Sequence, residues 1–161
     1  MIEIKNKSFS EIFSVYHDKR MLKILLLGAI SGFPWVLIGS SLSLWLKEDG
    51  LSRSTIGWAG LIFSVYAFNY LWAPLIDRVR IPFLTKKIGH RRSWIILMQG
   101  FILLSLILWS ILNPSENLGL VITIGLIIAI ASATQDITVD ALRIEQIGER
   151  EGESMAAGAA M

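Results

Sequence analysis

Four long apolar runs, separated by short polar segments, set the pattern of this chain. No charged side chain occurs in Ile24–Leu46, Ile56–Ile76, Ser93–Leu112 or Asn117–Gln135. Each run is close to the roughly 20 residues that a helix needs to cross a hydrocarbon core of about 30 Å. Soluble helices carry a polar face, and these four are apolar on all sides. The pattern predicts an all-α membrane protein with four transmembrane helices, at about 24–46, 56–76, 93–112 and 117–140, in a bundle over residues 21–142.

Basic residues lie mostly on one side of the expected membrane. All but two of the 15 Lys and Arg residues fall before the first run, between the second and third, or after the fourth; the exceptions are Lys47 and Arg53. Because cytoplasmic loops are enriched in Lys and Arg, the N-terminus is expected in the cytoplasm. Trp45 and Trp109 lie near the opposite boundary, where we expect them to anchor the helices.

The two ends of the chain differ from its centre. Residues 1–20 predict a cytoplasmic amphipathic segment, since Phe9, Ile12, Phe13 and Tyr16 form one apolar stripe of a surface helix. A frayed basic tail is an equally good interpretation. Residues 143–161 predict a polar connector followed by a fifth span. Only eight residues, Ser154–Met161, belong to that span, and they would cover about 12 Å. We therefore expect an interrupted protein.

Composition excludes several classes of function. Hydrophobic residues make up 53% of the chain and charged residues 17%, and there is no cysteine, which excludes disulfides and thiolate sites. No G-x-x-x-x-G-K-[ST] loop is present, so ATP-driven pumping is not expected. His17 and His90 stand alone, with no converging nucleophile or metal ligand. We expect no enzyme, no metal, no cofactor and no nucleic-acid partner.

The strongest functional signal is a pair of carboxylates at the end of the fourth run. Leu118–Ala133 carries no charge, and then Asp136, Asp140 and Arg143 follow on one helix stripe, with Gln135 about 100° from Asp136. Asp at a helix centre in the bilayer costs about 2.5–3.5 kcal/mol on insertion scales, so such a residue usually serves a function. Measured from Leu118, Asp136 lies about 27 Å along the helix and Asp140 about 33 Å.

Two interpretations of these residues stay open. In one, Asp136 couples transport to protons or contacts substrate, with Gln135 and Asp140 as further candidates. In the other, Asp140 and Arg143 form a structural i, i+3 ion pair at the cytoplasmic edge that also contacts Asp77 and Arg78.

The first run contains small residues and a proline. Gly28 and Gly32 form a G-x-x-x-G pattern that permits close helix packing. Pro34 removes one backbone hydrogen bond and can kink the helix. Bent helices line the substrate path of transporters, although G-x-x-x-G more often marks plain packing.

Together these residues resemble the muropeptide permease (AmpG-like) family of the major facilitator superfamily. The resemblance extends from the surface helix to the start of the fifth span and rests on four segments in the family's order: Gly28–Pro34, Leu71–Arg78, Ser132–Ala141 and Glu149–Gly152. The superfamily loop signature is only partly kept: Asp77 and Arg78 match, but Ala73 replaces its first glycine, and its second half appears late, as Gly89–Arg92, after an insertion. The eukaryotic acetyl-coenzyme A transporters are the nearest alternative.

The resemblance implies the N-terminal part of a twelve-span carrier in the bacterial inner membrane. Such a carrier imports peptidoglycan fragments (anhydro-muropeptides) with protons and needs the remaining spans as partners. In it, Asp77, Arg78 and Arg143 would form a gating lock between helix ends. Two alternatives stay open: a fragment of a split gene without transport activity, and a small channel assembled from several copies of four helices.

Overall fold

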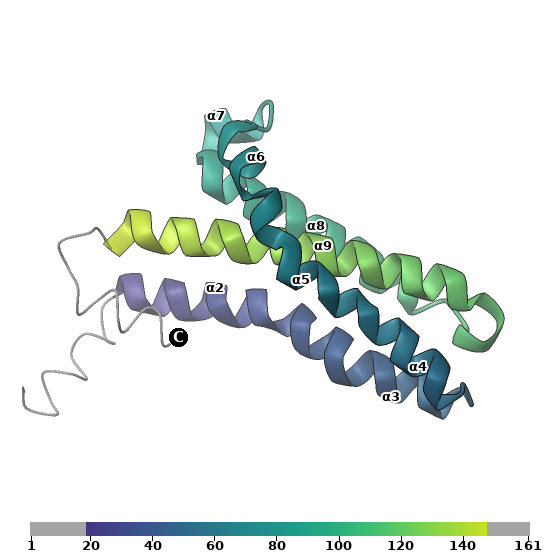
Figure 1. Ribbon diagram of the computed structural model, residues 1–161. Helices are drawn as coiled ribbons and strands as arrows, with labels where there is room; N and C mark the ends of the chain where they lie inside the picture. Colours follow the sequence, from purple (N-terminus) through teal and green to yellow (C-terminus); the bar gives the residue numbers. More distant parts are fainter. Residues whose placement is uncertain (1–18, 148–161) are drawn as a thin grey trace, which may run out of the picture.

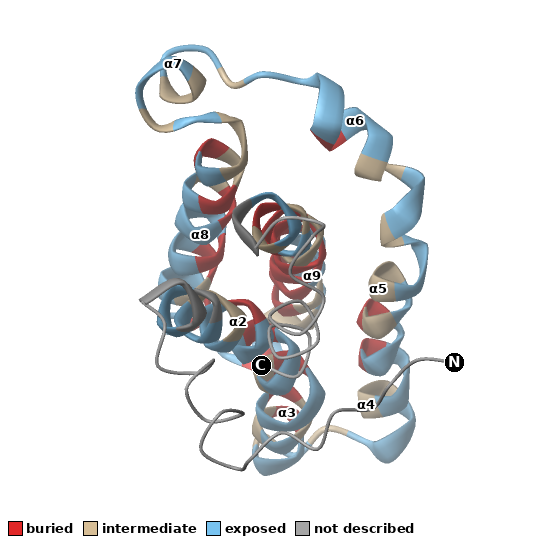
Figure 2. Ribbon diagram, turned by 90° about the vertical axis from the view of Figure 1, so that its left-hand side faces the viewer, coloured by how far each residue is buried: buried red, intermediate tan, exposed pale blue. Residues whose placement is uncertain are grey.

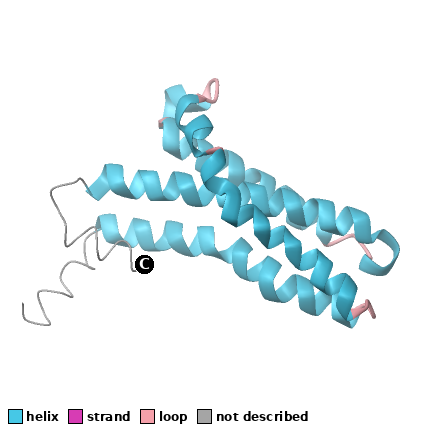
Figure 3. Ribbon diagram, in the orientation of Figure 1, coloured by secondary structure: helices cyan, strands magenta, loops and turns pink. Residues whose placement is uncertain are grey.

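The computed structural model describes residues 19–147, and every regular element in that range is a helix (Figure 3). Three helices are long and apolar enough to cross a membrane: Leu25–Glu48, His90–Trp109 and Pro114–Glu145. The predicted all-α membrane fold is therefore confirmed. The predicted surface helix and the start of the fifth span lie outside the described residues.

The first apolar run forms one continuous helical rod with a change of winding (Figure 1). Helix α2 covers Lys19–Val36, a wider π-helical segment covers Leu37–Leu42, and α3 covers Ser43–Glu48. Pro34 lies inside α2, where its missing N–H removes one hydrogen bond of the ladder. The wider segment begins three residues later, in the second half of the span, whereas the hydrogen bond that Pro34 removes would have been to the carbonyl of residue 30 in the first half.

The second apolar run is broken into short pieces. It consists of α4 (Arg53–Ala59), a 3₁₀ turn (Gly60–Phe63), α5 (Ser64–Phe68), a second 3₁₀ turn (Asn69–Leu71) and α6 (Ala73–Arg78). Phe68 and Trp72 have φ near −105° and ψ near 0°, outside the α-helical region. The break at Trp72 precedes Pro74, which stands in the first turn of α6. A membrane crossing by this run stays a prediction.

The last two long helices form an antiparallel pair. Helix α7 (Leu84–Ile88) leads into α8 (His90–Trp109) through Gly89, whose φ of +91° suits a residue without a Cβ. Helix α9 covers Pro114–Ile147 with one non-helical residue, Asn117. It continues beyond residue 140, where the predicted fourth span ends, and into the segment that the sequence suggests is a connector.

Helix α9 lies at the centre of the bundle. It packs against α2, α5, α6 and α8, and Figure 2 shows its buried positions between these neighbours. Half of its most apolar stretch is buried, against 22% for the first span and 28% for α8. The core residues are contributed by all the long helices and include Ile38, Leu46, Ile102, Val121 and Ile128.

Trp109 belongs to this core rather than to an interfacial belt. It is 7% exposed, its ring lies 5.9 Å from that of Trp45, and its indole N–H donates to the Val121 carbonyl over 3.0 Å. The prediction of an interfacial anchor was wrong for Trp109, because the α8–α9 turn folds the ring inward onto α9.

Close helix packing occurs at two glycines that the sequence did not single out. A Cβ on Gly39 would lie 2.8 Å from the Phe63 ring, and one on Gly125 would lie 2.9 Å from Ile62 Cδ1 and 3.0 Å from Trp109. A Cβ on Gly32 would meet no described atom within 4 Å. The packing role of the Gly28–Gly32 pattern thus stays a prediction.

The basic residues gather at one end of the bundle, which we call the basic end. Helices α2 and α8 begin there, and α6 and α9 end there (Figure 1). Its described cations include Lys23, Arg78, Arg80, Lys86, Lys87, Arg91, Arg92 and Arg143. The opposite end carries Lys47 and Arg53.

Candidate functional site

Asp136 lies on the face of α9 that packs against α2. The hydroxyl of Ser31, 105 residues earlier in the chain, donates a hydrogen bond to the Asp136 carboxylate. Ser31 is buried, and the fully buried Ser132 donates to the Ser31 carbonyl over 3.4 Å. Asp136 itself is half-buried. The carboxylate is therefore turned into the protein, where polar groups of α2 and α9 meet.

A third helix brings a hydroxyl to the same place. Tyr66 of α5 faces Ser132 and Asp136, and its buried oxygen makes no regular hydrogen bond with the described residues. We call Ser31, Tyr66, Ser132 and Asp136 the Asp136 cluster. It joins three helices through groups that can accept or donate a proton or hydrogen-bond a polar ligand.

Gln135 is fully buried but turned to a different side. At 100° per residue it lies about 100° from Asp136 and within about 20° of Leu142, which packs against Ile95 of α8. Neither the amide oxygen nor the amide nitrogen of Gln135 has a hydrogen-bond partner among the described residues. The two adjacent candidates, Gln135 and Asp136, therefore do not share one site in this conformation.

A further contact ties the broken second run to α9. The indole N–H of Trp72 donates to the Thr134 hydroxyl over 3.1 Å, and that hydroxyl also donates to the Ile130 carbonyl over 2.7 Å. The irregular turn before α6 is thus held against the side of α9 that lies away from Ser31.

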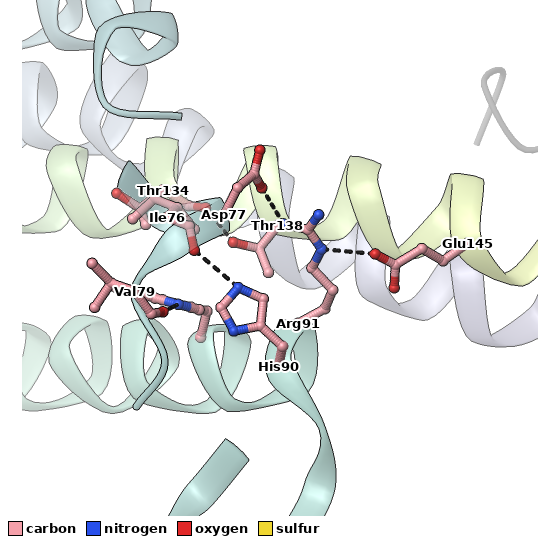
Figure 4. Close-up of polar contacts among 9 residues, drawn as sticks. Ile76, Asp77, Val79, His90, Arg91, Thr134, Thr138 and Glu145 are labelled. Atoms are coloured by element: carbon pink, nitrogen blue, oxygen red, sulfur yellow. Dashed lines mark hydrogen bonds and ion pairs between the residues drawn. The ribbon is translucent and has the colours of Figure 1, made fainter. Parts of the chain in front are cut away.

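Arg91 joins three helices at the basic end (Figure 4). From the first turn of α8, its guanidinium donates to Asp77 of α6 and, over 2.9 Å, to Glu145 of α9. Beside it, the ring of His90 bonds the Ile76 carbonyl over 2.9 Å through Nε2. Figure 4 shows Asp77 and Glu145 pointing toward Arg91 from two sides. We call Asp77, Arg91 and Glu145 the helix-end network.

Asp140 and Arg143 form the i, i+3 ion pair that one interpretation of the sequence predicts, with 3.3 Å between Arg143 Nη2 and Asp140 Oδ1. The Asp140 side chain is 63% exposed, so this pair contributes at most about 1 kcal/mol to stability. Asp77 contacts Arg91, and Arg78 is exposed. The expected gating residues are Asp77, Arg78 and Arg143, and of these the structure places Asp77 in the helix-end network.

Sequence reasoning missed the residues that complete both groups. Ser31 stands inside the Gly28–Gly32 pattern, and Arg91 belongs to Gly89–Arg92, the displaced second half of the loop signature, but the sequence pattern assigns neither residue a role in a site. Tyr66 and Glu145 carried no local signal. No three His, Asp or Glu side chains converge as metal ligands within residues 19–147.

Comparison with known proteins supplies the family. No protein-family model matches the chain. A Rickettsia felis protein named as transporter AmpG 4 is 37% identical over 150 residues, which is 93% of this chain and 36% of that protein. AmpG 1 of Rickettsia conorii is 40% identical over 80% of this chain and 31% of its own length. AmpG 3 of Rickettsia prowazekii is 39% identical over 85% of this chain and 32% of its own length.

The chain thus spans about one third of the length of these relatives. The match covers the three long apolar helices and both polar groups, because it extends over most of the 161 residues. Together with the all-helical membrane fold, it shows that this chain belongs to the AmpG-like transporter family.

Proposed function

We propose that this chain is the N-terminal part of a proton-driven secondary transporter that imports anhydro-muropeptides into the cytoplasm. The family and the multi-pass fold support transport. The import of peptidoglycan fragments and the coupling to protons rest on the resemblance of Gly28–Pro34, Leu71–Arg78 and Ser132–Ala141 to muropeptide permeases. The remaining spans of the carrier would come from sequence equivalent to the other two thirds of the relatives.

We place the protein in the bacterial inner membrane with the basic end in the cytoplasm. The argument is the charge asymmetry between the two ends of the bundle, since Lys and Arg are retained on the cytoplasmic side. Many large apolar side chains on α2 and α8 are more than half exposed, for instance Leu26, Phe33, Leu103 and Leu104. Acyl chains or further helices would cover these faces.

Asp136 is our candidate for proton coupling, and its contact with Ser31 is the observation that carries this role. Its carboxylate lies near the end of an apolar helix and contacts another span, so its charge affects how α2 and α9 pack. Binding a proton removes that charge, and a charge at bilayer depth is costly. Proton binding and release would therefore change the relative stability of two arrangements of α2 and α9.

The helix-end network is our candidate for the gating lock. Arg91 holds the ends of α6 and α9 to the start of α8, and it is only 17% exposed while its acidic partners are about half exposed. Separation of these helix ends would break both ion pairs together. Asp77 takes part directly, and Arg78 and Arg143 are placed at the same end as secondary candidates.

Uptake of labelled anhydro-muropeptide into proteoliposomes tests the proposal. The proteoliposomes contain this chain together with the later spans of a related carrier, and an imposed pH gradient drives uptake. Asp136→Asn is compared with Asp140→Asn, a matched control one turn further along α9 with an exposed side chain. We expect Asp136→Asn to abolish gradient-driven uptake and Asp140→Asn to retain most of it.

Two other results are informative. Equal uptake by wild type and Asp136→Asn would remove Asp136 from the mechanism. Uptake of acetyl-coenzyme A in place of the muropeptide would support the transport function but show that the proposed substrate is wrong.

A further inference from the structure

A groove with basic rims opens between α2 and α8 at the basic end, and no residue of the Asp136 cluster or of the helix-end network lines it. Its volume is about 440 Å³, and its floor is formed by Leu27, Ile95 and Leu142. Leu27 is half-buried and the other two are buried. Leu26 and Ile96 line its sides and are 56% and 54% exposed. The groove is therefore apolar along its length and open to the surroundings of the bundle.

Two cations stand at this groove, Lys23 from α2 and Arg92 from α8. Both are exposed, and no acidic side chain lines the groove. Within residues 19–147 neither cation forms an ion pair, whereas the adjacent Arg91 is occupied by Asp77 and Glu145. Arg92 also lies in the first turn of α8, where the backbone N–H groups favour a negative charge.

The two cations and the apolar walls of the groove are placed as the headgroup and the acyl chains of a membrane lipid would require. Lys23 comes two residues before the apolar span that begins at Leu25, and Arg92 lies in the first turn of the span His90–Trp109. The cations are thus at the level of the lipid headgroups, and the apolar walls continue toward the membrane interior. A free phosphate would satisfy the cations but leave the walls uncovered, and a zwitterionic lipid would cover the walls without a net negative charge.

We propose that this groove binds an anionic phospholipid, with the headgroup phosphate between Lys23 and Arg92 and an acyl chain along Leu26 and Ile96. Basic pockets between transmembrane helices bind anionic headgroups in this way, and each cation near the surface contributes about 1 kcal/mol. The bound lipid joins α2 to α8 at the end of the bundle where α9 also ends.

Lipid titration of the purified chain in an uncharged detergent tests this proposal. The lipids are dioleoyl phosphatidylglycerol and dioleoyl phosphatidylcholine, and bound lipid is counted by native mass spectrometry. Lys23→Gln with Arg92→Gln removes both cations, and Lys47→Gln with Arg53→Gln removes two cations at the opposite end as the matched control. We expect the groove pair to weaken phosphatidylglycerol binding about 25-fold, at about fivefold for each cation, and the control pair to leave it unchanged.

A third variant and a third ligand separate a lipid site from an anion site. Ile96→Trp fills the side of the groove, and we expect it to weaken phosphatidylglycerol binding although both cations remain. Glycerol phosphate, which has no acyl chains, is expected not to compete. The proposal is overturned if the groove pair and the control pair lose the same affinity, if phosphatidylcholine binds as tightly as phosphatidylglycerol, or if glycerol phosphate displaces the lipid.

Discussion

Replacing Gln135 by methionine should make the protein more stable. Gln135 is fully buried on the α8 side of α9, and both polar atoms of its amide lack a partner among the described residues. A buried polar group without a partner costs about 1–3 kcal/mol. Methionine is unbranched, similar in length and adaptable in a core, so it fills the same space without the amide. The free energy of unfolding should rise by about 1–3 kcal/mol, or about 5- to 150-fold in the unfolding equilibrium constant.

The measurement is reversible unfolding of the chain in mixed micelles, followed by loss of helical circular dichroism. Gln99→Met is the matched control, because Gln99 lies on α8 with an exposed side chain and should change stability by less than about 0.5 kcal/mol. A loss of stability in Gln135→Met would refute the reasoning, since it would show that the amide is satisfied by a group beyond residues 19–147. Loss of transport together with a gain in stability would mean that Gln135 is kept for function.

Two further predictions concern packing and the helix-end network. Gly125→Ala should destabilise the protein by about 1–3 kcal/mol relative to Gly119→Ala, because only the Cβ at Gly125 would press on neighbouring side chains; equal unfolding free energies for the two variants would contradict the close approach. Arg91→Gln should destabilise the basic end, and adding Asp77→Asn to it should change the unfolding free energy by less than Asp77→Asn does alone, because Arg91→Gln has already removed the ion pair between the two residues. Additive effects in this double-mutant cycle would show that the two residues do not interact.

The second apolar run shows where local pattern stops predicting structure. Its composition predicts one span over 56–76, yet the chain there alternates between α-helical and 3₁₀ segments. Pro74 is a local sequence signal for the break at Trp72, because proline is favoured in the first turn of a helix and α6 begins at Ala73. The contact that fixes Trp72 against Thr134 had no such signal, since the two residues are 62 positions apart.

Likewise, only part of the candidate site could be predicted from the sequence. Asp136 could be found because a charge next to an apolar run is rare and costly. Its partner could not be found, since many serines in the chain are chemically equivalent to Ser31 and only packing selects one. Gln135 looked like a companion of Asp136 because it is adjacent in sequence, but adjacent residues of a helix point about 100° apart.

The sequence by itself determined the class of this protein, because apolar runs of about 20 residues cross a membrane as helices, which satisfy their backbone hydrogen bonds within the segment. Tertiary structure alone decided which helix became the centre, which glycines allowed close contact and which of two neighbouring polar residues found a partner. The physical reason is the distance along the chain over which each interaction acts. Hydropathy acts through the solvent on each residue separately, whereas a hydrogen bond such as Ser31 to Asp136 exists only after distant segments have packed together.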